Sequence, residues 1–411
     1  MLQEILSSHW HLQQARLGLF GDYIDGLASH LLAQGYRHDY TRQKLHLIVA
    51  FGSWLQTHRY SLTALDEAKV DSFLRARRRR RTILRGDRMI LCWWLEHLRS
   101  EGHIPPRPKP TPSALDRAIA SYTDYLQQER GLARLTVRQY SFCVRRFLSE
   151  CFGRCPLRLD RLRQSDTNRH FQRQSAALNP NTMQSLAASL RSYFTFLRMR
   201  GDIQIDLASS VPAVACWRLS TVPRFIQPDE VQRLLAGCDQ NTVKGQRDYT
   251  ILLLLARLGL RAGEVVAMQL DDLHWETGEM LVRGKGQLLD HLPIPTDVGK
   301  ALAKYLRHGR PRCSSRHVFV RLNAPHREFG GAYVISTIVQ QTMDRIGLHP
   351  PCKGAHVLRH SLATHMLHRG ASLAEIGEVL RHRAPTTTEH YSKVAFDVLR
   401  ALAQPWPKEA L

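Results

Sequence analysis

The chain has 411 residues, 43% of them hydrophobic, so it is long enough for two or three domains with ordinary cores. Its charge is unusual, because 58 Lys and Arg against 36 Asp and Glu give a formal net charge of +22. Such an excess favours a nucleic acid partner over a protein that merely has a basic surface. The strongest apolar run, Ile251–Leu255, is too short to span a bilayer, and the N-terminus does not resemble a signal peptide. We therefore expect a cytoplasmic protein without membrane association.

The cysteines give no sign of a metal site. Eight are scattered along the chain, and the isolated pair Cys151 and Cys155 has no second Cys or His pair at zinc-ligand spacing. We expect reduced thiols and no bound metal.

Residues 1–104 are predicted to form a basic helical domain. Eight arginines lie between Arg75 and Arg88, five of them consecutive. Consecutive arginines repel one another, so such a run is usually a solvated face or a disordered arm. On DNA, however, each guanidinium neutralises a phosphate and releases counterions. We therefore interpret the five consecutive residues as phosphate contacts without base specificity: Arg77, Arg78, Arg79, Arg80 and Arg81.

A linker and a second helical domain follow. Residues 105–112 contain five prolines, which predicts an extended segment, and residues 113–210 are again rich in helical patterns. The two helical domains share residues in the same order: Gly35, Arg42, Gln43 and Phe51 recur 96 positions later as Gly131, Arg138, Gln139 and Phe147. Duplication explains this order, and chance similarity between two basic helical segments stays the alternative. Arg138 is included among the residues expected to bind DNA.

Residues 222–411 mix helical and strand patterns. Met280–Arg283, Gly284–Gly286 and His291–Ile294 are typical of a strand, a tight turn and a second strand. Further along, Ser372–Glu375 has the pattern of a capping box that opens a helix.

Five short stretches of this last part contain the residues suited to chemistry. They are Leu258-Gly-Leu-Arg261-Ala-Gly-Glu264, Gly284-Lys285-Gly286, His356-Val-Leu-Arg359-His360, Leu380-Arg381-His382 and Glu389-His390-Tyr391. Their order and spacing resemble the tyrosine recombinases, also called phage integrases, over about residues 113–403. The resemblance implies a mainly α-helical chain, with helical DNA-clamping domains followed by an α+β catalytic domain that contains a small antiparallel sheet.

The resemblance also implies the reacting groups. Tyr391 would attack a DNA phosphate and stay attached to it as a 3′-phosphotyrosine. Because the ordinary pKa of tyrosine is about 10, the phenol needs help in losing its proton at neutral pH. His356 would act as that base, and Lys285 would give a proton to the departing 5′ oxygen.

The remaining motif residues would stabilise charge. Arg261 and Arg359 would bind the non-bridging oxygens of the phosphorane, and His382 would donate to a phosphate oxygen. Glu264 either supports this site or is an ordinary buried ion-pair partner. No metal or nucleotide cofactor is expected, because cationic side chains neutralise the phosphate and the phosphotyrosine conserves the bond energy.

Three positions need separate comment. Gln287-Leu288-Leu289-Asp290 stands where the family usually has a basic residue after the turn, which argues against DNA contact by this loop. Arg381 replaces the usual glycine of Leu-Gly-His, and it either adds a DNA contact or points outward. His360 is interpreted as structural or as lying behind the site.

The family acts on double-stranded DNA as a tetramer that exchanges strands through a Holliday junction. We therefore expect a homo-tetramer or hetero-tetramer on paired sites, with accessory recombinases as further partners. The extra basic domain favours a mobile-element integrase or transposase. The helical spacing of Val394, Val398, Leu399 and Leu402 predicts a terminal helix that packs either on its own domain or on a neighbour. Two alternatives stay open: a type IB topoisomerase and a non-catalytic DNA-binding protein of the same fold.

Overall fold

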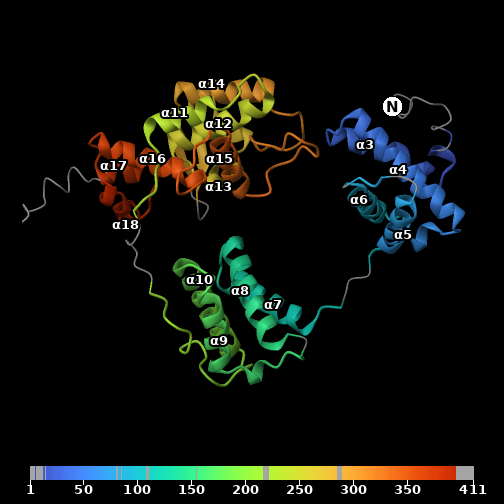
Figure 1. Ribbon diagram of the computed structural model, residues 1–411, viewed down its shortest axis with the longest axis horizontal. Helices are drawn as coiled ribbons and strands as arrows, with labels where there is room; N and C mark the ends of the chain where they lie inside the picture. The colour runs from blue at the N-terminus through green and yellow to red at the C-terminus, as the bar shows by residue number, and fades with distance from the viewer. Residues whose placement is uncertain are drawn as a thin grey trace, which may run out of the picture. The chain divides into compact units, whose positions relative to one another are not determined.

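A computed structural model describes residues 15–79, 82–84, 86–107, 111–153, 155–215, 222–284 and 289–394, together with Ile5 and Gln13. The described chain is mostly helical and has one three-stranded antiparallel sheet, which confirms the expected fold class (Figure 1). None of the helices in these ranges combines the length and the apolar character that crossing a membrane requires.

Backbone contacts divide the chain into two compact units, residues 109–221 and the remainder. Within the remainder, the buried hydrophobic side chains of the N-terminal part form a cluster separate from those of the C-terminal part. The division into three domains stays a prediction, and the parts are described separately below.

The N-terminal part is helical. Its elements are η1 (Gly21–Tyr23), α3 (Ile24–Ala33), α4 (His38–Thr57), η2 (Leu62–Ala64), α5 (Glu67–Arg78) and α6 (Asp87–Ser100). Phe51, Phe73 and Trp94 lie in its hydrophobic core. Within this core the Lys44 ammonium is buried and lies 2.7 Å from the Asp87 carboxylate. This ion pair joins α4 to the first turn of α6.

Residues 109–221 contain a second set of helices. The elements are α7 (Ala114–Asp124), the π-helical turn η3 (Tyr125–Glu129), α8 (Arg134–Phe152), η4 (Leu159–Arg161), α9 (Gln164–Ser175) and α10 (Pro180–Met199). Ser113 caps α7 and Asn179 caps α10, each by accepting a hydrogen bond from a backbone N–H three residues on. The core is aromatic, with Tyr122 and Tyr193 in a T-shaped arrangement 5.0 Å apart.

The repeat found in the sequence coincides with equivalent helices. Gly35 and Gly131 precede α4 and α8, and both have positive φ angles, 84° and 57°. A further pair of matching glycines, Gly102 and Gly201, lies 99 positions apart, and these residues follow α6 and α10 with φ angles of 79° and 77°. The matched residues therefore occupy corresponding positions in two sets of four helices, and duplication stays a prediction.

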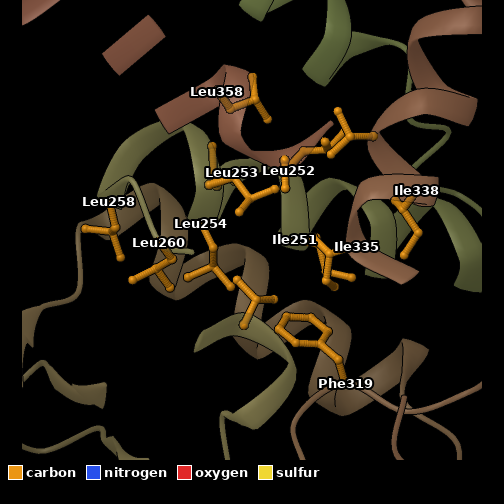
Figure 2. Close-up of a cluster of buried hydrophobic side chains, with 14 of the residues drawn as sticks. Ile251, Leu252, Leu253, Leu254, Leu258, Leu260, Phe319, Ile335, Ile338 and Leu358 are labelled. Carbon is orange, nitrogen blue, oxygen red and sulfur yellow. The ribbon is translucent and has the colours of Figure 1, made fainter. Parts of the chain in front are cut away.

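The C-terminal part is built around α12 (Val243–Leu258). Figure 2 shows its apolar side chains Ile251–Leu254 within the core, together with Leu358 of α16 and Phe319. Its segment Ile251–Leu255 is apolar and buried on all sides, because helices pack around it: α11 (Pro228–Ala236), α13 (Ala262–Ala267), α14 (Thr296–Lys304), α15 (Tyr333–Arg345) and α16 (Ala355–His368). The π-helical turn η6 (Tyr305–Gly309) continues α14.

The sheet is a meander of β1 (Leu273–His274), β2 (Glu279–Arg283) and β3 (Leu289–Pro293), preceded by η5 (Leu270–Asp272). The β3 strand begins two residues earlier than the sequence predicted, because Leu289 and Asp290 continue the pairing with Arg283 and Val282. Residues 285–288, which include the expected acid Lys285, lie outside the described residues.

The chain then passes through α17 (Leu373–Val379), α18 (Pro385–Thr388) and the 3-10 helix η7 (Glu389–Val394). The predicted capping box is confirmed, because Ser372 and Glu375 bond reciprocally to each other's backbone N–H. Val394 is buried against its own domain. The other three residues of the predicted terminal helix, Val398, Leu399 and Leu402, lie outside the described residues.

Candidate active site

Arg261 is positioned by the turn that ends α12. Gly259 has a left-handed φ of 57°, and a Cβ at this position would lie 2.7 Å from the Cδ2 atom of Leu380. The turn and the close approach of Leu380 both require glycine. Arg261 then stands at the N-terminus of α13, with its side chain 39% exposed.

Glu264 is a buried carboxylate that joins two guanidinium groups. Its Oε1 atom accepts from Nη1 of Arg261 at 2.7 Å, and its Oε2 atom accepts from Nη2 of Arg381 at 2.8 Å. Burial alone would raise the pKa of Glu264, but the backbone N–H of Arg261 and the guanidinium of Arg381 outweigh burial and lower it. Glu264 is therefore an ionised, buried ion-pair partner, and its support of the reaction stays a prediction.

Arg359 carries a buried charge, and none of the acidic residues that the structure describes forms an ion pair with it. Its guanidinium donates to the carbonyl oxygens of Gly259 and Leu380. Burial, followed by the positive charges of Arg261 and Arg381, lowers the pKa of Arg359 to about 10. The three guanidinium groups exceed the charge of Glu264, so the cluster favours an anion.

Tyr391 is buried beside these cations. Its hydroxyl group and Nδ1 of His360 form a hydrogen bond of 2.8 Å. Burial raises the pKa of Tyr391 to about 12, although the charges of Arg359 and Arg261 act in the opposite direction. The phenol is therefore protonated at neutral pH.

His382 lies parallel to Tyr391, with ring centroids 6.5 Å apart. Its Nδ1 atom bonds to the buried hydroxyl of Thr388 at 2.8 Å. Burial, followed by the charge of Arg359, lowers the pKa of His382 to about 4, so the ring is neutral at neutral pH.

His356, the predicted base, is exposed near the start of α16. Its Nε2 atom lies 3.1 Å from Sγ of Cys352, and its ring is 5.9 Å from that of His360. No hydrogen bond joins His356 to Tyr391 within the described part of the chain. The structure thus brings Arg261, Glu264, Arg359, His382 and Tyr391 together, and it places His360 between Tyr391 and His356.

Two residues contact the expected site residues more closely than the sequence indicated. His360 contacts the Tyr391 hydroxyl, and the four-residue spacing of the two histidines on one helix was the available signal that either could face it. Arg381 does not point outward, because its side chain is 8% exposed and bonds to Glu264. The outward interpretation failed because Glu264 is 117 residues away in the sequence.

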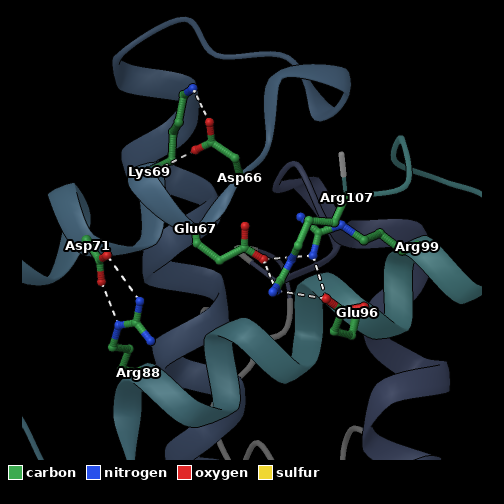
Figure 3. Close-up of polar contacts among 8 residues, drawn as sticks. All are labelled: Asp66, Glu67, Lys69, Asp71, Arg88, Glu96, Arg99 and Arg107. Carbon is green, nitrogen blue, oxygen red and sulfur yellow. Dashed lines mark hydrogen bonds and ion pairs between the residues drawn. The ribbon is translucent and has the colours of Figure 1, made fainter. Parts of the chain in front are cut away.

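The predicted DNA-binding arginines have different surroundings. Arg78 and Arg79 are exposed at the end of α5, whereas the Arg77 guanidinium lies 5.9 Å from the centre of the Phe73 ring. Arg138 is exposed on α8. Arg80 and Arg81 lie outside the described residues. At the far end of the run, Arg88 of α6 pairs with Asp71 of α5 at 2.7 Å, and Figure 3 shows this ion pair together with that of Arg99 and Glu67, which also connects the two helices.

The chain matches two family profiles. The profile described as "Phage integrase family" matches residues 224–397, and that described as "Phage integrase, N-terminal SAM-like domain" matches residues 119–201. Two solved structures show a similar fold. The XerH site-specific recombinase bound to palindromic difH substrate, in a post-cleavage complex, has a TM-score of 0.55 and 17% identity, covering 71% of this chain and 85% of its own. A lambda integrase dimer bound to a COC′ core site has a TM-score of 0.52 and 15% identity, covering 72% of this chain and 98% of its own.

Two curated relatives are more similar in sequence. The protein y4rA of Sinorhizobium fredii (strain NBRC 101917 / NGR234), named as an integrase/recombinase, is 42% identical over 390 residues, which are 94% of this chain and 95% of y4rA. The tyrosine recombinase XerD of Listeria monocytogenes (strain ATCC BAA-679 / EGD-e) is 31% identical over 282 residues, which are 67% of this chain and 93% of XerD. The chain therefore belongs to the phage integrase family of tyrosine recombinases.

Proposed function

We propose that the chain is a site-specific DNA recombinase that cleaves and rejoins DNA through a 3′-phosphotyrosine at Tyr391. The observation that supports this most is the buried guanidinium of Arg359, which lacks an acidic partner among the described residues and acts electrostatically on Tyr391. A buried charge without a partner is unfavourable, and a phosphate anion would offset that penalty. The named XerH and lambda integrase structures, which contain DNA sites, support DNA as the source of the phosphate.

The proposed reaction is a direct displacement at phosphorus. A bond forms from the Tyr391 oxygen to phosphorus as the bond from phosphorus to the 5′ oxygen breaks. Arg261 and Arg359 donate to the non-bridging oxygens, and His382 is a third donor. Fixed donors of this kind are worth about 3 kcal/mol each in a transition state.

Protons move in the same step. His356 accepts the phenol proton of Tyr391, and Lys285 gives a proton to the departing 5′ oxygen, which leaves as a hydroxyl. A 5′-hydroxyl from the partner strand then attacks the phosphotyrosine by the reverse route. The bond energy is retained throughout, so no nucleotide is consumed.

Tyr391 must change its surroundings before it attacks. Its hydroxyl is buried and bonded to His360, and this bond must be exchanged for the approach to phosphorus. A hydrogen bond of this type contributes about 1 kcal/mol net, so DNA contacts suffice to replace it. We infer that DNA binding and exposure of Tyr391 are coupled.

The wider setting is also part of the proposal. The exposed residues Arg78, Arg79 and Arg138 would contact DNA phosphates, as would Arg77, Arg80 and Arg81. The enzyme would act in the cytoplasm as a homo- or hetero-tetramer on paired sites, with accessory recombinases, as an integrase or transposase of a mobile element.

The test is a strand-exchange assay on supercoiled plasmids. Sites are taken from the DNA that flanks the gene, where a mobile element would have its ends, and two copies are placed in one plasmid. Recombinant products support the proposal. Relaxed plasmid without recombinants would indicate a type IB topoisomerase, and tight binding with neither product would indicate a non-catalytic DNA-binding protein.

A further inference from the structure

We propose that Arg381 is a positioning residue that holds Arg261 in place through Glu264, with Asp290 as an outer partner. The inference rests on the proposed function and adds to it a residue outside the assigned site. Glu264 bonds to a different guanidinium with each carboxylate oxygen, Arg261 on one side and Arg381 on the other. Arg381 and Glu264 are 8% and 3% exposed, whereas Arg261 is 39% exposed. Arg381 is thus the buried residue behind Glu264, and Arg261 on the other side of Glu264 is exposed enough to reach a phosphate.

The backbone at Arg381 indicates that its side chain is needed. Its φ angle is 55°, in the left-handed region that residues with a Cβ atom rarely adopt. The family pattern usually has glycine here, which would adopt this conformation without strain. This chain instead places a long cationic side chain at a strained position and buries it. The ion pair with Glu264 offsets both penalties.

A second departure from the family pattern faces the first. Asp290 stands on β3, in the segment where a basic residue usually follows the turn, and its Oδ2 atom lies 3.8 Å from Nε of Arg381. That Nε atom has no hydrogen-bond partner in the described ranges, so Asp290 is the acidic group that balances it. The negative charge of Asp290 therefore partly offsets the positive charge of Arg381, and both residues depart from the family pattern.

The expected effect on the reaction follows from Glu264. With Arg381 present, the Glu264 carboxylate is paired with a second positive charge, and each of its two oxygens is held by a different guanidinium group. Without Arg381, Glu264 would be a buried anion whose one remaining guanidinium partner is Arg261. Arg261 would then be drawn toward Glu264 and away from the phosphate, and the loss would appear in the chemical step more than in DNA affinity.

The central variant is Arg381→Gly, which keeps the backbone conformation and removes the guanidinium. Single-turnover cleavage of a nicked suicide substrate at saturating DNA should slow by at least about tenfold, as expected for a misplaced catalytic group. The dissociation constant for DNA should stay within about twofold. Arg381→Lys retains both the charge and the strained backbone, so it should recover most of the rate. Asp290→Asn, at a half-exposed position, should slow cleavage in the same direction by a smaller factor.

A double-mutant cycle separates positioning from a general structural effect. Because Arg381 acts through Arg261, Arg261→Lys combined with Arg381→Gly should cleave no more slowly than Arg261→Lys alone. Multiplicative effects in this cycle, or Arg381→Gly cleaving at the wild-type rate, would overturn the inference.

If Arg381→Gly fails to fold, the test uses Arg381→Lys and Asp290→Asn. Cleavage by Asp290→Asn at the wild-type rate, or cleavage by Arg381→Lys as slow as by Arg261→Lys, would overturn the inference. If wild-type protein forms no covalent complex on this substrate, the proposed function fails and this inference fails with it; wild-type cleavage with no Arg381 effect overturns this inference alone.

Discussion

His360 and His382 both lie near Tyr391, and both rings are neutral at neutral pH because their pKa values are lowered. Burial is the largest cause that lowers the pKa of each to about 4, from an ordinary value of 6.5, and neighbouring positive charges add to it. Between these two pH values the unfolded chain binds protons that the folded chain does not. The stability that these histidines contribute is therefore complete above about pH 6.5 and is lost as the pH falls through about 4.

This difference predicts an acid-sensitive catalytic domain. The free energy of unfolding should fall between pH 6.5 and pH 4, by at most about 3 kcal/mol for each histidine. His360→Asn and His382→Asn should each flatten the decline, because asparagine does not titrate. Urea denaturation at a series of pH values measures the effect, and variants that decline as steeply as wild type would refute it.

Lys285 is expected to act as the acid for the departing 5′ oxygen. Lys285→Ala should slow cleavage of an ordinary substrate by about 100-fold or more, in the range of general acid catalysis. A substrate with a 5′-bridging sulfur, whose thiolate leaves without a proton, should restore most of the rate. Absence of rescue would point to a binding role for Lys285 instead.

For single residues, the sequence allowed the members of the site to be predicted but not all of the contacts among them. Arg261, Arg359, His382 and Tyr391 were identified from the resemblance of their motifs to those of tyrosine recombinases, and the structure brings them together. The His360 contact was missed because two histidines of one helix compete for the same neighbour. Arg381 was misjudged because no local pattern predicts a contact across 117 residues.

The turn between α12 and α13 is the element on which the site depends most. Gly259 lets α12 end in a left-handed residue, accepts a hydrogen bond from Arg359 and leaves room for Leu380. One position thus sets the places of both proposed phosphate-binding arginines.

Gly259→Ala should therefore destabilise the catalytic domain by about 1–3 kcal/mol, since a left-handed alanine is strained and its Cβ would meet Leu380. Gly263 in α13 is the matched control, because an added Cβ there meets nothing within 4 Å. Gly263→Ala should change stability by less than about 1 kcal/mol. Thermal unfolding of the two variants compares them, and equal effects would contradict this account of the turn.

The end of α5 offers exposed arginines to a polyanion. Arg78 and Arg79 have no acidic partner among the described residues, whereas Arg88 is paired with Asp71. Replacing Arg78 and Arg79 together by Gln should reduce the slope of log affinity against log salt by about 1.8. The control Arg88→Gln should leave the slope nearly unchanged. A slope that is unaltered in the double variant would exclude α5 from the DNA contact.

Helices and strands were predictable where one pattern dominated. Ser372 caps its helix as predicted, and the two strands predicted on either side of the turn pair antiparallel as β2 and β3. The start of β3 was placed late because Leu289 and Asp290 have no alternation that distinguishes them from a turn. Their pairing with β2 is a tertiary interaction that the sequence pattern does not encode.

At the scale of the whole molecule, the N-terminal region has sequence similarity to one of the relatives. The alignment with y4rA covers 94% of this chain, so it includes most of residues 1–104, whereas that with XerD covers 67%. Residue pattern and charge together predicted a basic helical region here, and its proposed origin by duplication agrees with the equivalent helices. Its role on DNA could not be predicted in detail, because a run of arginines indicates binding to a polyanion but does not indicate a particular DNA sequence.

The central claim is that Tyr391 becomes covalently linked to DNA. The direct measurement is covalent trapping on a nicked suicide substrate, with wild-type protein and Tyr391→Phe compared at equal DNA occupancy. We expect that wild-type protein forms a denaturation-resistant DNA adduct, that peptide mapping places it at Tyr391, and that Tyr391→Phe binds DNA normally without forming it. An adduct of equal yield in Tyr391→Phe, or one mapped to another residue, would contradict the account.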